Sequence, residues 1–214
     1  MKTVILLSGG LDSCVVLAMA LEKKRECYAV SFDYGQHHRI ELAYAQKIAR
    51  HYGVSHRVLS IDPHAFQHSS LISGHHIPKQ RSVQEISIDE TPATYVPARN
   101  TLFIAYAIGQ AEILDAQEIH IGVNAMDSGP YPDCRPAFFH RFQQVINIAT
   151  RQAFEGAPPH LLTPLIHWDK REIVKEGRRL NVPFFLTFSC YDPTPKGDPC
   201  ECCDACVLRS YAFS

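Results

Sequence analysis

The feature that most constrains the fold is a short apolar strand pattern that runs directly into a glycine pair near the N-terminus. The run TVILL at residues 3–7 has the length and β-rich composition of a strand buried on both faces. Ser-Gly-Gly follows at residues 8–10, and glycine lets a backbone turn sharply and approach a ligand closely. Asp12 and Ser13 then favour the start of a helix. Such a turn exposes a row of backbone N–H groups, which predicts a phosphate-binding loop.

The rest of the chain alternates between strand and helix patterns. This order predicts an α/β fold with a doubly wound, mostly parallel sheet and right-handed crossovers. Ligands bind such sheets beyond the carboxyl ends of the strands, so residues 8–13 and 33–36 are expected to face one crevice. The expected strands are residues 3–7, 27–33, 56–61, 118–123 and 161–166; the expected later helices are residues 40–53, the one capped by Asn100, residues 137–153 and the one capped by Asp169.

Length and composition indicate one main domain with a small appendage. A chain of 214 residues that is 46% hydrophobic can bury one substantial core. We expect that domain to cover residues 1–182 and a small segment to follow at 183–214. Residues 63–97 contain several prolines and histidines with little periodicity, and a loop this long is usually functional, so we predict an active-site flap. Its histidines show no metal-ligand spacing and are expected on the polar surface; they are His64, His68, His75 and His76.

The net charge and the hydropathy pattern argue against two classes of partner. A formal net charge of −1 does not suit a surface that binds nucleic acid regardless of its sequence. No run has the length of a transmembrane helix, and the N-terminal apolar stretch is broken by Ser-Gly-Gly and Asp12, unlike a secretory signal. We therefore expect a cytoplasmic protein that binds neither nucleic acid nor membrane.

The eight cysteines fall into two groups. Cytoplasmic cysteines rarely form a disulfide framework, and Cys14, Cys27 and Cys134 are expected as small buried residues. The remaining group offers four thiolates to one tetrahedral ion, for which zinc is suited, and a full set of four cysteines indicates a structural site. The expected ligands are Cys190, Cys200, Cys203 and Cys206, with Cys202 as a bystander, because Cys202 cannot easily point inward together with its two neighbours.

Three loops at expected strand ends carry candidate substrate residues. They are the segments FDYGQ at 32–36, VPARN at 96–100 and YPDCR at 131–135. Two arginines can grip a carboxylate or phosphate through bidentate hydrogen bonds. An acid and an amide can read the edge of a purine-like ring, on which a tyrosine stacks. Arg99 and Arg135 are the candidate arginines. Asp133 and Gln36 are the candidate acid and amide, and Tyr34 is the candidate stacking residue.

The sequence of the glycine loop at residues 8–13 distinguishes it from other phosphate-binding loops. It lacks the Lys-Ser or Lys-Thr of a Walker loop and the spacing of a dinucleotide loop. Its string SGGLDS resembles the PP-loop of the N-type ATP pyrophosphatases. The resemblance implies a Rossmann-like domain of the adenine nucleotide α-hydrolase type, with ATP and Mg²⁺ bound and the α-phosphate open to attack. The ATP-binding residues it implies are Leu7, Ser8, Gly9, Gly10, Leu11, Asp12, Ser13, Cys14 and Val15, among which Asp12 and Ser13 are assigned to catalysis.

The motifs taken together resemble one family over nearly the whole chain. SGGLDS, FDYGQ, VPARN, YPDCR, TPL at 163–165, SCYD at 189–192 and the terminal cysteines occur in the order found in the 7-cyano-7-deazaguanine synthases of queuosine precursor biosynthesis. That resemblance implies an ATP-dependent carbon–nitrogen ligase that converts 7-carboxy-7-deazaguanine and ammonia to the 7-cyano product, with one structural zinc per chain. The family's zinc cysteines fall on the four positions that the spacing indicates.

Three positions depart from the family pattern. His37 follows FDYGQ where the family usually has arginine, residues 127–131 read DSGPY before the common PDCR, and Glu201 replaces a glycine of the cysteine cluster. None of these changes touches the ATP loop or removes a metal ligand. The first two lie near the expected substrate crevice.

The resemblance suggests a mechanism and leaves two alternatives. The carboxylate would attack the α-phosphate of ATP, ammonia would displace AMP to give an amide, and a second adenylation would give the nitrile. His37 and Asp133 are the candidate general bases. One alternative is a PP-loop tRNA sulfur-transferase with a persulfide on Cys190 or on a terminal cysteine. The second is a zinc-ribbon interaction module. Phe184, Phe185 and Phe188 are expected on the surface and favour a homodimer.

Overall fold

The central element is a five-stranded sheet in the strand order β3-β2-β1-β4-β5, with every neighbouring pair parallel. The computed structural model describes residues 1–66, 69–74, 76–86 and 91–214. The strands are β1 (Lys2–Leu6), β2 (Glu26–Asp33), β3 (Ser55–Ser60), β4 (Glu118–His120) and β5 (His160–Leu162). β1 lies in the middle of the sheet. From β1, the strands follow outward as β2 and β3 on one side and as β4 and β5 on the other. The predicted doubly wound parallel sheet is confirmed.

β4 and β5 are shorter than the sequence pattern predicts. After β4 the chain leaves the sheet, and residues 121–123 line a cavity. After β5 the chain turns, because the Ile166 N–H donates to the Thr163 carbonyl at 3.1 Å. The apolar residues there are buried against the cavity and the helices rather than in a longer sheet.

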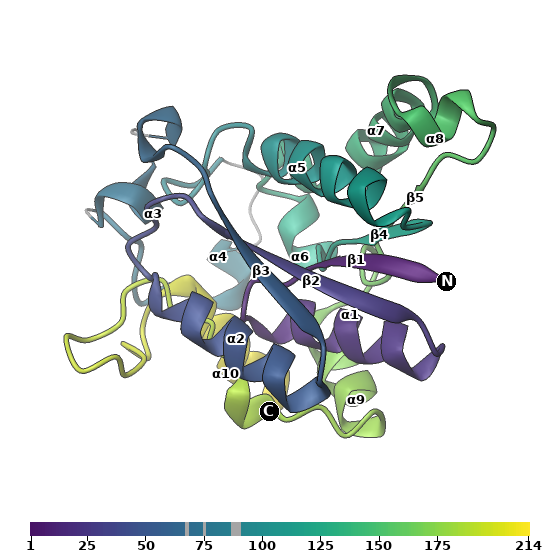
Figure 1. Ribbon diagram of the computed structural model, residues 1–214. Coiled ribbons are helices and arrows are strands. Elements are labelled where there is room, and N and C mark those ends of the chain that lie inside the picture. The colour runs from purple at the N-terminus through teal and green to yellow at the C-terminus, as the bar shows by residue number, and fades with distance from the viewer. Residues whose placement is uncertain (67–68, 75, 87–90) are drawn as a thin grey trace.

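Helices cover both faces of the sheet (Figure 1). One face packs against α1 (Leu11–Glu22) and α2 (Ile40–Tyr52), and α9 (Lys170–Arg179) packs on α1, with fully buried residues such as Val15, Ile48 and Ile173. The other face packs against α5 (Arg99–Leu114) and α7 (Pro136–Ala149), with Ile104, Ile119 and Phe139 in its core. No described helix has the length and apolar character needed to cross a membrane.

Two predicted helix details are wrong. Asn100 is not the N-cap of α5: Ala98 holds that position, and Asn100 lies in the first turn. The predicted helix over residues 137–153 is two helices, α7 and α8 (Arg151–Phe154), because Thr150 is extended and its hydroxyl caps α8 by accepting from the Ala153 N–H. By contrast, Asp169 caps α9 as predicted, in a capping box with Glu172.

The helices in the described part of the predicted flap are short. They are η1 (Pro63–Phe66), α3 (Ser70–Ser73) and α4 (Val83–Ile86). Leu71 and Thr94 from this segment line the cavity. His64 and His76 are exposed as predicted, whereas His68 and His75 lie outside the described residues.

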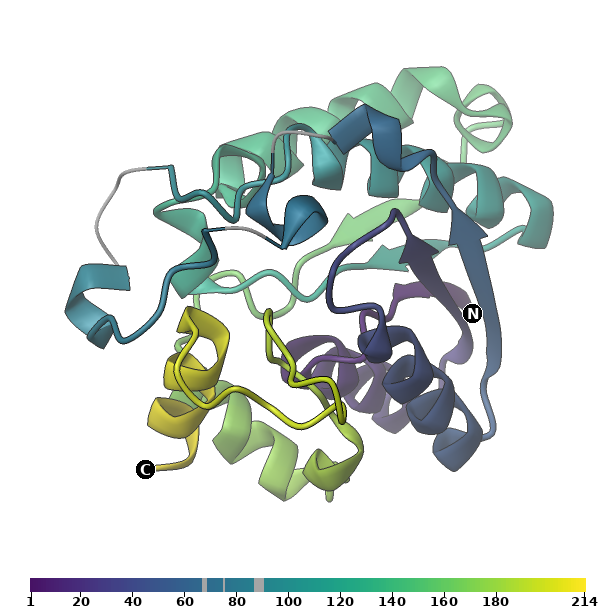
Figure 2. The same cartoon turned by 90° about the vertical axis from the view of Figure 1, so that its left-hand side faces the viewer.

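The C-terminal segment, with η3 (Phe184–Leu186) and α10 (Asp204–Phe213), lies beside the flap in both views (Figures 1 and 2). Lys79 forms an isolated antiparallel bridge with Cys203, and the Gln80 N–H donates to the Cys202 carbonyl at 2.7 Å. Arg81 forms a bidentate ion pair with Asp204. These contacts join the flap to the cysteine segment.

The expectation of three exposed phenylalanines is partly wrong. Phe188 is only 4% exposed, because it packs in a small core with Ile77, Cys190 and Cys203. Phe184 packs against Phe213 with the ring planes at 90°. Phe185 is 81% exposed, as predicted.

Candidate active site

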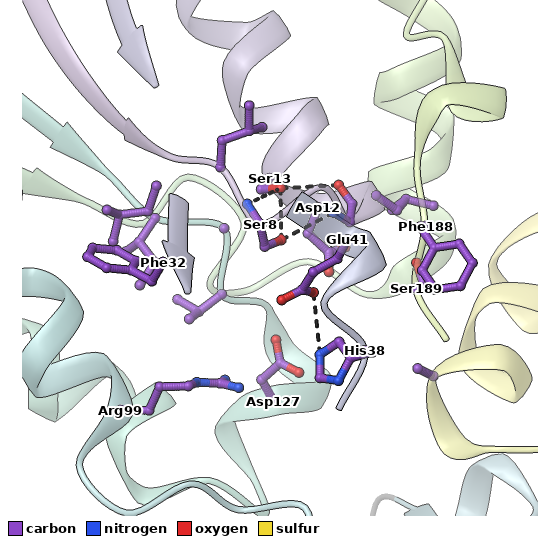
Figure 3. Close-up of a pocket in the computed structure, with 18 of the residues that line it drawn as sticks. Ser8, Asp12, Ser13, Phe32, His38, Glu41, Arg99, Asp127, Phe188 and Ser189 are labelled. Carbon is purple, nitrogen blue, oxygen red and sulfur yellow. Dashed lines mark hydrogen bonds and ion pairs between the residues drawn. The ribbon is translucent and has the colours of Figure 1, made fainter. Parts of the chain in front are cut away.

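The predicted phosphate loop connects β1 to α1 and forms one wall of a cavity of about 240 Å³ at the carboxyl edge of the sheet (Figure 3). The Ser13 hydroxyl holds the loop together: it accepts from the Ser8 N–H at 3.1 Å, lies 3.0 Å from the Ser8 hydroxyl and donates to the Gly10 carbonyl at 3.1 Å. The first N–H groups of α1, at Leu11 and Asp12, have no acceptor within the helix. They supply the positive end of the helix dipole at the cavity wall.

Two glycines let this loop fit its surroundings. Gly9 has φ +89°, and a Cβ there would lie 2.2 Å from the backbone oxygen of Glu41. Gly122, which follows β4, packs against the loop, where a Cβ would lie 3.0 Å from the Ser13 nitrogen. The backbones of three elements thus approach closely around the loop, and any larger residue would displace it.

Charged side chains surround the loop. Lys170, the first residue of α9, lies 2.6 Å from Asp12 Oδ2, while Asp12 Oδ1 is buried with no hydrogen-bond partner among the described residues. Burial opposes the charge on Lys170, but the carboxylates of Asp12 and Asp127 outweigh it and raise the pKa of Lys170. Burial raises the pKa of Asp127, against the effect of Lys170. The loop therefore combines a fixed cation with an acidic oxygen that lacks a partner.

The opposite wall is aromatic and carries Arg99 (Figure 3). Burial opposes the charge of Arg99, but the Tyr34, Cys134 and Asp133 groups near it raise the pKa of Arg99 above its ordinary value. Arg99 forms no ion pair with a described carboxylate, so its charge is available to a ligand. Burial raises the pKa of Tyr34 to about 12, so its phenol stays neutral. The aromatic residues of this wall are Phe32, Tyr34, Phe103, Tyr131 and Tyr191.

The structure brings some of the predicted residues into the cavity wall and leaves others outside it. Residues 7, 8 and 10–13 line the cavity together with Tyr34 and Arg99. Gly9, Cys14 and Val15 belong to the same loop and helix but lie behind this wall. The phosphate loop and the VPARN motif therefore face each other across one space.

Four predicted substrate or base residues have their side chains elsewhere. Asp133 accepts from the backbone N–H of Asn100 at 3.0 Å, and so supports the start of α5. Arg135 is exposed and donates to the Gly129 carbonyl, while Gln36 is buried within its own turn. The His37 ring pairs with Asp192 at 3.2 Å outside the cavity. These residues shape or border the site without lining it.

Several cavity residues were missed from the sequence. Asp127 comes from the variant segment before PDCR, Lys170 follows a helix cap, and His38 follows the FDYGQH string. Arg209 comes from α10 and donates to the hydroxyls of Thr187 and Ser189. The position of Lys170 directly after a capping aspartate was the one available signal, since helix N-termini at the carboxyl edge of a sheet face the ligand.

The predicted metal cysteines are together. The sulfur atoms of Cys190, Cys200, Cys203 and Cys206 all lie within 4.8 Å of one another, and Cys202 is not part of this group. Backbone N–H groups donate to these sulfurs, as from Cys200 to Cys190 Sγ at 3.2 Å. Four thiols at this spacing fit a single tetrahedral metal ion. Cys14, Cys27 and Cys134 are buried, as predicted.

Comparison with known proteins identifies the family. The model of the queuosine biosynthesis protein QueC matches residues 2–214. The chain belongs to the QueC family. A 7-cyano-7-deazaguanine synthase of Leptospira interrogans is 47% identical over 99% of this chain and 86% of its own length. Another from Nitrosococcus oceani is 45% identical over 99% of this chain and 93% of its own. The family expected from the motifs is confirmed, and with it an ATP-dependent ligase of queuosine biosynthesis.

Solved structures of lower identity share the fold. The U34-tRNA thiolase NcsA of Methanococcus maripaludis, which contains a [4Fe-4S] cluster, superposes with a TM-score of 0.52 at 13% identity, over 99% of this chain and 64% of that one. An NMN synthetase of Francisella tularensis gives 0.50 at 20% identity, over 93% and 70%. These likenesses confirm the expected α/β fold.

Proposed function

We propose that this chain converts 7-carboxy-7-deazaguanine and ammonia to 7-cyano-7-deazaguanine at the expense of ATP, with the cavity as its active site. The observation that carries the proposal is the SGGLDS loop facing Arg99 across the cavity in a chain of the QueC family. One wall suits a triphosphate and the other suits a planar ring with a negative group.

ATP would bind with its pyrophosphate on the loop. The N–H groups at the start of α1 and the Lys170 ammonium would stabilise the charge that develops on the departing pyrophosphate. The partnerless Asp12 Oδ1 fits a Mg²⁺ ion that accompanies ATP, because Mg²⁺ prefers carboxylate oxygens. The substrate carboxylate would then attack the α-phosphate and release pyrophosphate.

The deazaguanine would lie against the aromatic wall. The Arg99 guanidinium would attract the carboxylate, and the rings of Tyr34 and Tyr131 would border the heterocycle. Gln36 and Asp133 would act indirectly, the first by holding the turn after β2 and the second by holding the start of α5. Arg135 would contribute at the rim.

The four clustered cysteines would hold one structural zinc ion, which suits an all-thiolate set. Bound zinc would keep the C-terminal segment folded, and through Lys79 and Arg81 that segment would hold the flap. We expect chelation to speed hydrogen exchange in residues 79–81 before it affects α1 and the sheet. Equal exchange before and after chelation, with metal loss verified by elemental analysis, would argue against this role.

The sulfur-transferase alternative requires a reactive cysteine at the site. Cys134 is the cysteine among the described residues that line the cavity, and its thiol accepts from Asn100 Nδ2 at 3.2 Å. Burial raises the pKa of Cys134, which disfavours the thiolate that a persulfide mechanism needs. An interaction module alone would leave the cavity and its buried charges without a role.

The test of the proposal is the product. Incubation with ATP, ammonium and 7-carboxy-7-deazaguanine should yield the nitrile by mass spectrometry, and omission of ammonium should abolish it. An amide that persists while ATP remains would overturn the nitrile assignment. In a parallel incubation with tRNA, ATP and a persulfide sulfur donor, thiolation of the tRNA would favour the alternative.

We also propose that the chain forms a homodimer. Phe185 is exposed, and Ile148 and Phe154 add apolar surface on α7 and α8 with exposed fractions of 85% and 95%. Analytical ultracentrifugation should give twice the mass of one chain. A monomer at micromolar concentration would contradict this proposal.

A further inference from the structure

A buried histidine at the cavity wall has no role in the account above. His38 lines the cavity, and its side chain is only 6% exposed. Its Nδ1 atom is buried and has no hydrogen-bond partner in the described part of the chain. Buried polar atoms are nearly always satisfied, so a partnerless nitrogen beside a cavity marks a place where a bound ligand completes the contact.

The other ring nitrogen of His38 faces a carboxylate. Nε2 lies 3.4 Å from Glu41 Oε2, one turn ahead on α2 (Figure 3). Glu41 is itself fixed, since its Oε1 accepts from Gln36 Nε2 at 3.0 Å. Gln36 also donates to the Phe32 carbonyl and accepts from the Tyr34 N–H, which anchors it to the turn after β2.

This arrangement favours one tautomer of the His38 ring. A carboxylate beside Nε2 favours the proton on that nitrogen, which leaves the lone pair of the neutral ring on Nδ1. The segment from Gln36 through His38 to Glu41 therefore orients a proton acceptor in the cavity wall.

We propose that His38 is the general base for the nitrogen steps of the reaction and that Glu41 and Gln36 are its positioning residues. This inference rests on the proposed function. When ammonia attacks the acyl-adenylate, a C–N bond forms, the C–O bond to AMP breaks with its electron pair on AMP, and Nδ1 takes one proton from the nitrogen. After the second adenylation, the remaining two N–H protons leave in turn through the same atom as the imidate forms and then loses AMP. Each proton passes to solvent before the next transfer.

His38 is better placed to act as the general base than the other titratable residues near it. Burial raises the pKa of Tyr191, whose ring lies 5.7 Å from that of His38, well above its ordinary value, so it stays neutral. Asp127 lies between Arg99 and His38 in Figure 3, but its Oδ2 already accepts two hydrogen bonds from Asn124, and its charge interacts with that of Lys170. The His37 ring is 40% exposed and paired with Asp192.

A step-resolved assay tests the proposal. Exchange of labelled pyrophosphate into ATP, with 7-carboxy-7-deazaguanine and without ammonium, reports adenylation, which needs no base. His38→Asn should keep this exchange within about threefold of wild type while amide formation falls by ~10²-fold or more. His140→Asn, an exposed histidine on α7, is the matched control and should change neither rate. Added imidazole should restore part of the amide formation of His38→Ala.

Glu41→Gln tests the proposal independently if His38→Asn does not fold. Its amide would donate toward Nε2 and move the ring proton to Nδ1, so amide formation should fall by about tenfold with exchange intact. A parallel loss of exchange and amide formation in both variants would show a binding role and overturn the proposal. Normal amide formation in His38→Asn would also overturn it. An absence of exchange in the wild-type protein would instead overturn the proposed function, and this inference with it.

Discussion

The ion pair between Asp12 and Lys170 links the stability of the domain to its chemistry. Its atoms are 2.6 Å apart, and the two side chains are 21% and 13% exposed. Lys170→Met would leave Asp12 and Asp127 close together without their cation. Removing one partner of a buried pair costs about 3–5 kcal/mol, and the partial exposure here puts the expected loss in the free energy of unfolding near ~3 kcal/mol.

Urea unfolding at pH 7 measures this loss as a lower midpoint with an unchanged slope. The pair of changes Asp12→Asn and Lys170→Met should recover about 2 kcal/mol of it, because residue 12 is then neutral and only Asp127 is left without its cation. The single and the double variant should both lack ATP-dependent activity, because neither has the Lys170 ammonium that would neutralise the pyrophosphate. Lys175→Met, an exposed lysine on the same helix, should stay within about 0.5 kcal/mol of wild type.

Two results would refute this reasoning. The first is a Lys170→Met protein that is as stable as the wild type, which would mean that the pair is solvated. The second is a destabilised protein that still exchanges pyrophosphate at the wild-type rate, which would separate Lys170 from the phosphate site.

Three further predictions concern the loop, α5 and the amino edge of the sheet. Gly9→Ala should abolish ATP binding in calorimetry, because its Cβ would clash with the backbone of α2; wild-type affinity would contradict this. Asp133→Ala should lower the free energy of unfolding by about 1–2 kcal/mol with little change in the KM of the carboxylate; a large KM change at unchanged stability would indicate direct substrate contact. Burial opposes ionisation of Glu118, but hydrogen bonds from His120 and Arg25 outweigh it and lower its pKa. The stability that Glu118 contributes should therefore be lost as pH falls through that lowered pKa, and Glu118→Gln should flatten this acid loss in urea titrations between about pH 5 and 3; an unchanged acid loss would contradict it.

Much of the fold follows from periodicity and local chemistry. The strand–glycine–helix pattern at residues 3–13 predicted the central strand, the turn after it and the helix start, because a buried strand and a sharp turn require characteristic residue types. Asp169 predicted its helix start in the same way. The cysteine spacing predicted the four-sulfur group, because ligand geometry restricts which positions can point inward.

The site was harder to predict because its residues are selected by tertiary contacts. Asn100 looked like a helix cap, but the carboxylate of Asp133 from a distant loop satisfies that helix end instead. The same contact removes Asp133 from the cavity wall. Conversely, nothing local in the sequence brings Lys170 to Asp12, which is 158 positions away. Asp133 and Gln36, which looked like ligand contacts, bond to the backbone in this structure, while the cavity also includes positions outside the motifs, such as Lys170.

The stoichiometry of nucleotide products tests the central claim most directly. With 7-carboxy-7-deazaguanine and ammonium, the protein should release two AMP and two pyrophosphate for each nitrile formed, and Asp12→Ala and Ser13→Ala should release neither. Release of ADP and phosphate, or near wild-type turnover in either variant, would contradict the assignment of residues 8–13 as the pyrophosphate site of an adenylating ligase.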